Sequence, residues 1–210
     1  MAEKRHVLVA GASGLVGFAA MKHFSSLADC EVTAVSRRKP GETFGARFIA
    51  ADLTDVKQCA EIFGAMGDVT HLVYAALYEK PGLVKGWLED DQIATNDAML
   101  RNLFEPLEKS ATRLRHVSLL QGTKAYGVHV RVLEVPARED RSEMYEQKNF
   151  YWLQESYIRD KQHGKPWSWT IFRPQVICGM ALGGAMNLIP ALGVYGALLK
   201  DAGEPLYFPG

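Results

Sequence analysis

A glycine-rich turn near the N-terminus constrains the fold of this chain more than any other feature. An apolar, β-branched segment at residues 6–10 runs directly into Gly11-Ala12-Ser13-Gly14-Leu15-Val16-Gly17. Apolar residues then recur at helical spacing. Glycines lack a Cβ, so they allow a tight turn, close helix–strand packing and the approach of a pyrophosphate to the backbone. Because the free N–H groups of a helix start also favour phosphate, this strand, turn and helix predict a dinucleotide-binding unit.

Strand-like and helix-like segments alternate along most of the chain. Parallel strands need crossover connections, so this alternation predicts an α/β fold, a Rossmann-type doubly wound parallel sheet with helices on both faces. Asp55 is the expected N-cap of the second helix. Strands are expected at residues 6–10, 31–36, 46–50, 71–76, 115–120 and 168–173, and helices at residues 14–27, 56–66, 89–110 and 149–163.

Composition excludes several classes of function. The chain has 210 residues, and its 24 Lys+Arg balance its 24 Asp+Glu, so it has no global positive field for nucleic acid or an acidic membrane. No apolar stretch reaches the roughly 20 residues of a membrane helix. The three cysteines form no CxxC pair and the six histidines are scattered, so no metal site is expected. A cytoplasmic globular protein without a nucleic-acid or membrane partner is expected.

The end of the second strand bears on the choice of dinucleotide. An NAD-binding chain places an acid there for the ribose 2′-OH, whereas this chain has Ser36, Arg37 and Arg38. Guanidinium groups pair with a 2′-phosphate through parallel N–H···O bonds, so these residues favour NADP(H). The alternative is a basic run on a solvated turn.

Further cofactor contacts are expected where later strands end. Asp52 and Leu53 follow the third strand, at a place that would flank the adenine, although Asp52 would also suit a helix cap. Small residues after the fourth strand would let the cofactor pass close to the backbone, or would serve packing alone. The expected cofactor-binding residues are Gly11, Ser13, Gly14, Leu15, Val16, Gly17, Ser36, Arg37, Arg38, Asp52, Leu53, Ala75, Ala76, Leu77, Gln121, Lys124, Tyr151, Pro174 and Ile177.

The glycine spacing GxxGxxG resembles that of short-chain dehydrogenase/reductases. Ordinary members place a Tyr-x-x-x-Lys on the helix after the fifth strand, where the lysine lowers the pKa of the phenol. Here Tyr151 is followed four residues later by Glu155, which cannot do the work of that lysine. The usual catalytic Ser/Thr position holds Gly122, and Lys124 lies just past the end of the fifth strand, at the edge where such sheets bind ligands.

The order of the later motifs is more specific. The segments Leu120-Gln121-Gly122-Thr123-Lys124-Ala125-Tyr126-Gly127 and Asn149-Phe150-Tyr151, with Gln154-Glu155 following, resemble the progesterone 5β-reductase/iridoid synthase family of atypical extended short-chain reductases. That resemblance implies an NADPH-dependent enone reductase whose catalytic residues are Lys124 and Tyr151. The family's second tyrosine is Trp152 here. Residues 172–179 resemble the element that passes the nicotinamide, with a main-chain N–H near Ile177.

The expected reaction is conjugate reduction. Hydride would reach the β-carbon of an enone or enal, and Tyr151, supported by Lys124, would stabilise the enolate oxygen. The expected partner is a small apolar carbonyl compound in a pocket to which Trp87, Tyr78 and Phe150 contribute. Two alternatives stay open: a non-catalytic NADP(H)-binding sensor, and an NAD-dependent epimerase/dehydratase-like enzyme. The oligomeric state, a homodimer included, is not indicated.

The organisation of the chain follows from this resemblance. We expect residues 1–179 to form the NADP(H)-binding Rossmann domain that carries the catalytic pair. Residues 180–210 would begin a truncated substrate-binding region, since the Gly- and Ala-rich sequence after Arg173 shows no capped helix or completed strand and the family continues beyond this length.

Overall fold

A computed structural model describes residues 4–80, 86–141, 144–180 and 187–207. Its centre is a six-stranded, wholly parallel sheet in the order β3-β2-β1-β4-β5-β6. This is the doubly wound Rossmann order, so the predicted fold class is confirmed. The strands are β1 (Arg5–Ala10), β2 (Cys30–Ser36), β3 (Arg47–Ala50), β4 (His71–Tyr74), β5 (His116–Leu120) and β6 (Ser168–Phe172).

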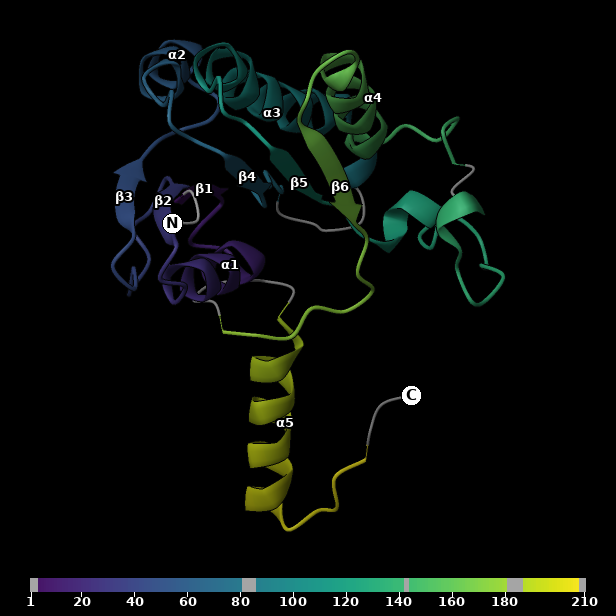
Figure 1. Ribbon diagram of the computed structural model, residues 1–210. Helices are drawn as coiled ribbons and strands as arrows, with labels where there is room; N and C mark the ends of the chain where they lie inside the picture. The colour runs from purple at the N-terminus through teal and green to yellow at the C-terminus, as the bar shows by residue number, and fades with distance from the viewer. Residues whose placement is uncertain (1–3, 81–85, 142–143, 181–186, 208–210) are drawn as a thin grey trace.

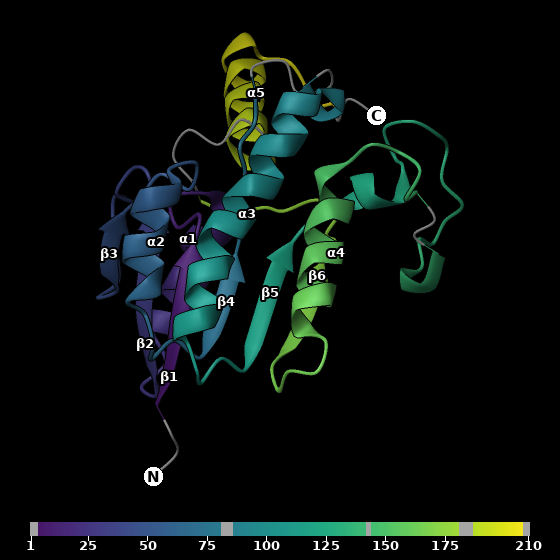
Figure 2. The same ribbon diagram turned by 90° about the horizontal axis from the view of Figure 1, so that it is seen from above.

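Helices cover both faces of the sheet (Figures 1 and 2). α2 (Val56–Gly64), α3 (Asp90–Ser110) and α4 (Phe150–Gln162) lie on one face, and α1 (Leu15–Ser25) lies on the other. The larger core cluster joins the strands to the first group, and a smaller one joins β1, β2 and β4 to α1. The central strands are therefore buried on both faces, which explains their nearly continuous apolar runs.

Local sequence accounts for the element boundaries. Asp55 accepts hydrogen bonds from the backbone N–H groups of Lys57 and Gln58 at 3.0 Å, which confirms it as the N-cap of α2. Asn149 caps α4 in the same way, through the N–H of Tyr151. The fourth strand ends at Tyr74, two residues earlier than predicted, where the next residue, Ala75, comes into close contact with Gly11 of the glycine turn.

The prediction that no capped helix follows residue 173 is wrong. Helix α5 (Leu188–Ala202) begins at Asn187, whose side chain accepts from the N–H of Ile189, and ends at Gly203 in the left-handed conformation. Pro190 does not break this helix because it lies in the first turn, where its missing N–H would have no intrahelical partner. In Figure 1 α5 extends away from the sheet, and none of its residues is buried.

Short 3₁₀ turns, one of them Gly86–Leu88 before α3, lie in the segments between these elements. Residues 128–141 and 144–148 form an irregular excursion between β5 and α4 that contains the 3₁₀ turn Glu139–Arg141. Another 3₁₀ turn, Thr123–Tyr126, follows β5 and carries Lys124. None of the described helices combines the length and apolar character needed to cross a bilayer.

Candidate active site

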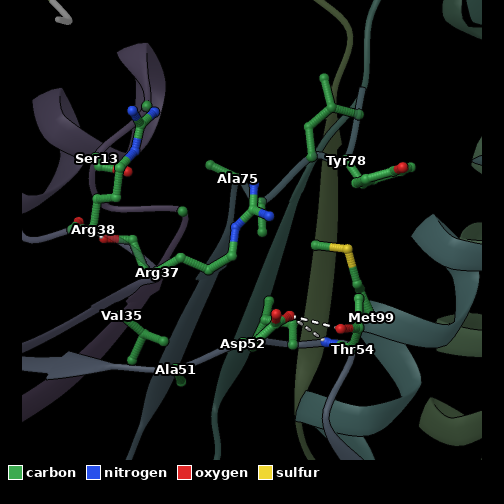
Figure 3. A pocket seen from close by; sticks show the side chains of 16 residues that line it. Ser13, Val35, Arg37, Arg38, Ala51, Asp52, Thr54, Ala75, Tyr78 and Met99 are labelled. Carbon is green, nitrogen blue, oxygen red and sulfur yellow. Dashed lines mark hydrogen bonds between the residues drawn. The ribbon is translucent and has the colours of Figure 1, made fainter. Parts of the chain in front are cut away.

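A cavity of about 240 Å³ opens at the carboxyl edge of the sheet. It lies where the strand order reverses between β1 and β4, the position at which doubly wound sheets bind ligands. Its walls come from the segments that follow β1, β2, β3 and β4, and from α3 (Figure 3). The lining residues are Gly11, Ser13, Gly14, Val35, Ser36, Arg37, Arg38, Ala51, Asp52, Leu53, Thr54, Ala75, Ala76, Leu77, Tyr78 and Met99.

Glycine is required at two positions of the turn after β1. Gly11 has φ +83°, and a Cβ there would lie 2.6 Å from the carbonyl carbon and oxygen of Ala75. A Cβ on Gly17 would lie 2.1 Å from the carbonyl oxygen of Gly11, so this glycine lets α1 pack against the turn. As at any helix start, the N–H groups of Leu15 and Val16 have no acceptor within the helix. The turn thus has the close backbone packing and free donors that a pyrophosphate requires.

The turn after β2 supplies the positive charge of the cavity. Arg38 extends beside Ser13, and Arg37 reaches toward Ala75 (Figure 3). Neither arginine forms a salt bridge with an acid in the described part of the chain. The Ser36 hydroxyl donates to the Arg38 carbonyl at 2.7 Å and so shapes the turn. Two unpaired guanidinium groups beside a glycine turn fit a phosphorylated dinucleotide.

Asp52, after β3, lines the same cavity (Figure 3). Its carboxylate accepts hydrogen bonds from the backbone N–H of Thr54 at 2.9 Å and from the Thr54 hydroxyl at 2.8 Å. These bonds, with a smaller contribution from Arg37, hold the pKa of Asp52 below its usual value. The carboxylate is therefore fixed and ionised, and its orientation is set by the turn before α2.

The cavity brings together most of the predicted adenine and phosphate contacts. The predicted residues that line it are Gly11, Ser13, Gly14, Ser36, Arg37, Arg38, Asp52, Leu53, Ala75, Ala76 and Leu77. The predicted residues outside its lining are Leu15, Val16, Gly17, Gln121, Lys124, Tyr151, Pro174 and Ile177. Sequence reasoning missed Val35, Ala51, Thr54 and Met99, and it expected Tyr78 in the substrate pocket, whereas Tyr78 lines this cavity. The first three adjoin predicted residues and could have been included; Met99 reaches the cavity only through the packing of α3.

Tyr151 lies at the carboxyl end of β5, beside Gly122. A Cβ on Gly122 would lie 3.4 Å from the Tyr151 hydroxyl oxygen and 3.8 Å from the Pro174 carbonyl oxygen. Tyr151 is buried, and within the described chain no residue hydrogen-bonds to its hydroxyl group. The hydroxyl is thus an available donor, next to a position where glycine leaves space for another group.

Lys124 and Tyr151 meet around one indole ring. The Lys124 Nζ lies 3.5 Å from the centroid of the Trp87 ring, and the Tyr151 ring packs edge-on against the same indole at 5.4 Å between centroids. Trp87 is itself fixed by a 2.9 Å hydrogen bond from its Nε1 to Glu79. Phe150 packs against both Trp87 and Tyr151, so this corner of the site is apolar.

Burial shifts the two candidate catalytic groups in opposite directions. It raises the pKa of Tyr151 well above that of a free phenol, and the negative charge of Glu79 adds to this while Arg173 opposes it. Burial lowers the pKa of Lys124, and Glu79 opposes that shift. Tyr151 is consequently a neutral hydroxyl donor at physiological pH.

Glu155 does not face the Tyr151 hydroxyl. It is buried, and its two carboxylate oxygens accept from Arg159 at 2.6 Å and from Arg173 at 2.7 Å. Arg173 also donates to Gln121, whose amide donates to the backbone carbonyl of Tyr151. The side chain one turn after Tyr151 therefore belongs to an ion-pair network that joins α4 to β5 and β6.

Comparison with known proteins identifies the family. The PRISE-like Rossmann-fold domain matches residues 63–210. The chain belongs to this family. The predicted resemblance to progesterone 5β-reductase and iridoid synthase is thereby confirmed, and the motifs at residues 120–127 and 149–151 lie inside the matched part of this PRISE-like domain.

Curated relatives agree with this assignment. The chain is 31% identical to 3-oxo-Δ(4,5)-steroid 5β-reductase of Arabidopsis thaliana, over 97% of its own length and 54% of the relative. It is 26% identical to (S)-8-oxocitronellyl enol synthase of Antirrhinum majus, again over 97% of this chain and 54% of the relative. The chain spans about half the length of the curated relatives it matches.

Solved structures share the fold of the PRISE-like domain. UDP-glucose 4-epimerase of Brucella ovis, in complex with NAD, superposes with a TM-score of 0.70 over 94% of this chain and 62% of that chain. The sequence identity is 18%, so this likeness establishes the fold alone.

Proposed function

We propose that this chain, as a member of the PRISE-like family, binds NADPH and reduces activated C=C bonds of enones or enals. The observation that carries the proposal is the Tyr151 hydroxyl, a neutral and available donor at the sheet edge where the dinucleotide cavity opens. The two curated relatives above are named as a steroid 5β-reductase and an enol synthase, which supports reductase chemistry on a conjugated carbonyl compound.

The residues around the cavity fit NADP(H). Gly11 and Gly14 would receive the pyrophosphate with the N-terminus of α1, and Arg37 and Arg38 would pair with the 2′-phosphate. When bound, the reduced nicotinamide supplies the hydride that the reaction requires. Replacing both arginines with glutamine should lower the affinity for NADPH about 100- to 10,000-fold, because each of the two charged hydrogen bonds lost is worth on the order of 1.5–3 kcal/mol. The affinity for NADH should change little. Equal loss for both cofactors would contradict this role.

Tyr151 would act on the substrate rather than on the hydride. As hydride reaches the β-carbon, negative charge develops on the carbonyl oxygen. A hydroxyl group that is already protonated and placed at that oxygen stabilises the enolate without prior proton transfer. The proton at the α-carbon then comes from water or from a neighbouring group, which completes the reduction of the C=C bond.

Lys124 and the aromatic corner would complete the site. The Lys124 ammonium, held against the Trp87 ring, adds positive potential where the enolate forms. Trp87 and Phe150 form an apolar wall beside the Tyr151 hydroxyl, which suits a small apolar carbonyl compound. The substrate is proposed by this chemistry alone.

Two other functions make different predictions. A non-catalytic NADP(H) sensor would bind the cofactor and turn over nothing. An epimerase-like enzyme would favour NAD and would use a Tyr-x-x-x-Lys pair, yet here Glu155 holds the lysine position and is saturated by two arginines. The available Tyr151 donor favours the reductase.

NADPH oxidation with a panel of small enones and enals tests the proposal. The protein in its complete natural sequence should turn over with a preference for NADPH. Loss of the oxyanion donor in Tyr151→Phe should lower kcat about 100- to 1000-fold. The matched control is Tyr145→Phe, since Tyr145 is 56% exposed and packs on Trp152 instead. Tight NADPH binding without turnover in the unaltered protein would contradict the reductase and favour the sensor.

A further inference from the structure

The position that ordinary short-chain reductases give to a catalytic lysine is occupied here by a buried carboxylate with two arginine partners. The Glu155 side chain is 7% exposed. Its inner partner, Arg173, is 11% exposed, whereas its outer partner, Arg159, is 54% exposed. A buried carboxylate with two arginine partners at the end of the sheet is more than a surface charge.

The Arg173 guanidinium donates hydrogen bonds to two different side chains. Its NH2 donates to Glu155 at 2.7 Å and its Nε donates to the Gln121 side-chain oxygen at 3.0 Å. Gln121 in turn donates to the backbone carbonyl of Tyr151 at 3.1 Å. The Arg173 guanidinium also lies 5.6 Å from the ring centroids of Tyr126 and Trp152. One side chain thus joins the ends of β5 and β6 to the first turn of α4.

This junction contains two backbone segments that lie beside the Tyr151 hydroxyl. Gly122 directly follows Gln121, and Pro174 directly follows Arg173. A Cβ placed on Gly122 would lie 3.4 Å from the Tyr151 hydroxyl oxygen and 3.8 Å from the Pro174 carbonyl oxygen, so these groups lie around one point. The hydrogen bonds of Arg173, together with the backbone bond from the Gln121 N–H to the Phe172 carbonyl, therefore link the segments that carry Tyr151, Gly122 and Pro174.

We infer that Glu155 and Arg173 form a positioning pair, which fixes the Tyr151 hydroxyl relative to the segment at residues 174–177. The inference rests on the proposed function. Glu155 does not touch the reacting atoms; it orients Arg173, which holds Gln121 and the start of residues 174–177. In this chain Glu155, one turn after Tyr151, positions other groups, and Lys124 supplies the positive charge.

Stability alone is a weak reason for such a pair. Burying two charges costs several kcal/mol each, and a buried ion pair often stabilises a fold no better than well-packed apolar residues do. The planar Arg173 guanidinium, with its fixed donor directions, does hold its partners in a precise orientation. A displacement of the reacting groups by about 1 Å can lower the reaction rate about 100-fold.

The test compares Glu155→Gln with Arg159→Gln as its matched control, because Arg159 binds the same carboxylate from the exposed side. Three quantities are measured: kcat with an enone, the dissociation constant of 2′,5′-ADP, and the emission of bound NADPH, which reports on the nicotinamide environment without turnover. Glu155→Gln should lower kcat about 10- to 100-fold and change the NADPH emission. The affinity of Glu155→Gln for 2′,5′-ADP should stay within about twofold of that of the unaltered protein. In Arg159→Gln all three quantities should stay within about twofold.

A second variant keeps the inference testable if Glu155→Gln does not fold. Arg173→Lys retains the charge but cannot serve Glu155 and Gln121 together, so it should reproduce the loss of kcat and the altered emission. Unchanged kcat and emission in a folded Glu155→Gln or Arg173→Lys would overturn the pair. If the unaltered protein shows no enone turnover, the proposed function fails, while the NADPH emission still decides on the positioning pair.

Discussion

The close approach between the glycine turn and the chain after β4 can be tested by adding a single methyl group. Gly11→Ala places a Cβ 2.6 Å from the carbonyl carbon and oxygen of Ala75 and 2.7 Å from the next backbone nitrogen. All three neighbours are backbone atoms, which cannot rotate away as a side chain can. Gly11 also has φ +83°, so alanine is strained there for a second, independent reason.

Gly45→Ala separates these two effects. Gly45 has φ +84°, and a Cβ there would meet nothing within 4 Å. The left-handed conformation costs a non-glycine residue about 1–2 kcal/mol, and forcing atoms into a packed region costs about 1–3 kcal/mol more. We therefore expect Gly45→Ala to lower the free energy of unfolding by about 1–2 kcal/mol and Gly11→Ala by about 2–5 kcal/mol.

Urea unfolding followed by circular dichroism measures both variants, and 2′,5′-ADP binding reports on the cavity. Gly11 lines the cavity, so its variant should also lose 2′,5′-ADP affinity, whereas the Gly45 variant should keep it. Equal destabilisation of the two variants, with 2′,5′-ADP affinity retained in both, would refute the close approach and with it the geometry of the turn.

Two further predictions follow from the other described residues. Burial raises the pKa of the Cys59 thiol to about 11. A thiol reagent at pH 8 should therefore label exposed Cys178 quickly and Cys59 only on unfolding. Comparable labelling rates for the two cysteines in the folded protein would contradict the packing of α2. The Lys161 ammonium, aided by other donors, lowers the pKa of Glu105 to about 2. Because the pKa of Glu105 is lower in the folded state, the stabilisation is present above about pH 4.5 and is lost as the pH falls toward 2. Glu105→Gln should therefore be less stable than the unaltered protein at pH 7 and equally stable near pH 2. An equal difference in stability at both pH values would contradict this ion pair.

The positions of polar, basic and glycine residues relative to the strands predicted much of the candidate cofactor site. Residues that directly follow parallel strands must meet at one edge of the sheet, so Gly11, Arg37 and Ala75 could be assigned to one cavity from strand positions alone. Met99 could not, because its place depends on the angle at which α3 packs on the sheet. Helix α5 was missed since its glycines and Pro190 obscured the helical pattern, although Asn187 and Gly203 were readable as caps.

The candidate catalytic corner was less predictable. Tyr151 and Lys124 were found through their motifs, and Trp87 was expected in the pocket wall. Its contacts with both of them were not predicted, because Trp87 reaches that place from a distant part of the chain. The inner partner of Glu155 was equally hidden, because Arg173 directly follows β6 and only the folded sheet brings it beside α4. Contacts between elements distant in sequence decide these roles, and no spacing rule encodes them.

The transfer of deuterium tests the central claim most directly. The protein in its complete natural sequence is incubated in ordinary water with a small cyclic enone and NADPH deuterated at the nicotinamide C4, and the product is analysed by NMR and mass spectrometry. The account predicts a saturated ketone with one deuterium at the β-carbon and a solvent hydrogen at the α-carbon, and loss of this product in Tyr151→Phe. Deuterium at the carbonyl carbon of an alcohol, or no transfer from NADPH that is bound, would contradict it.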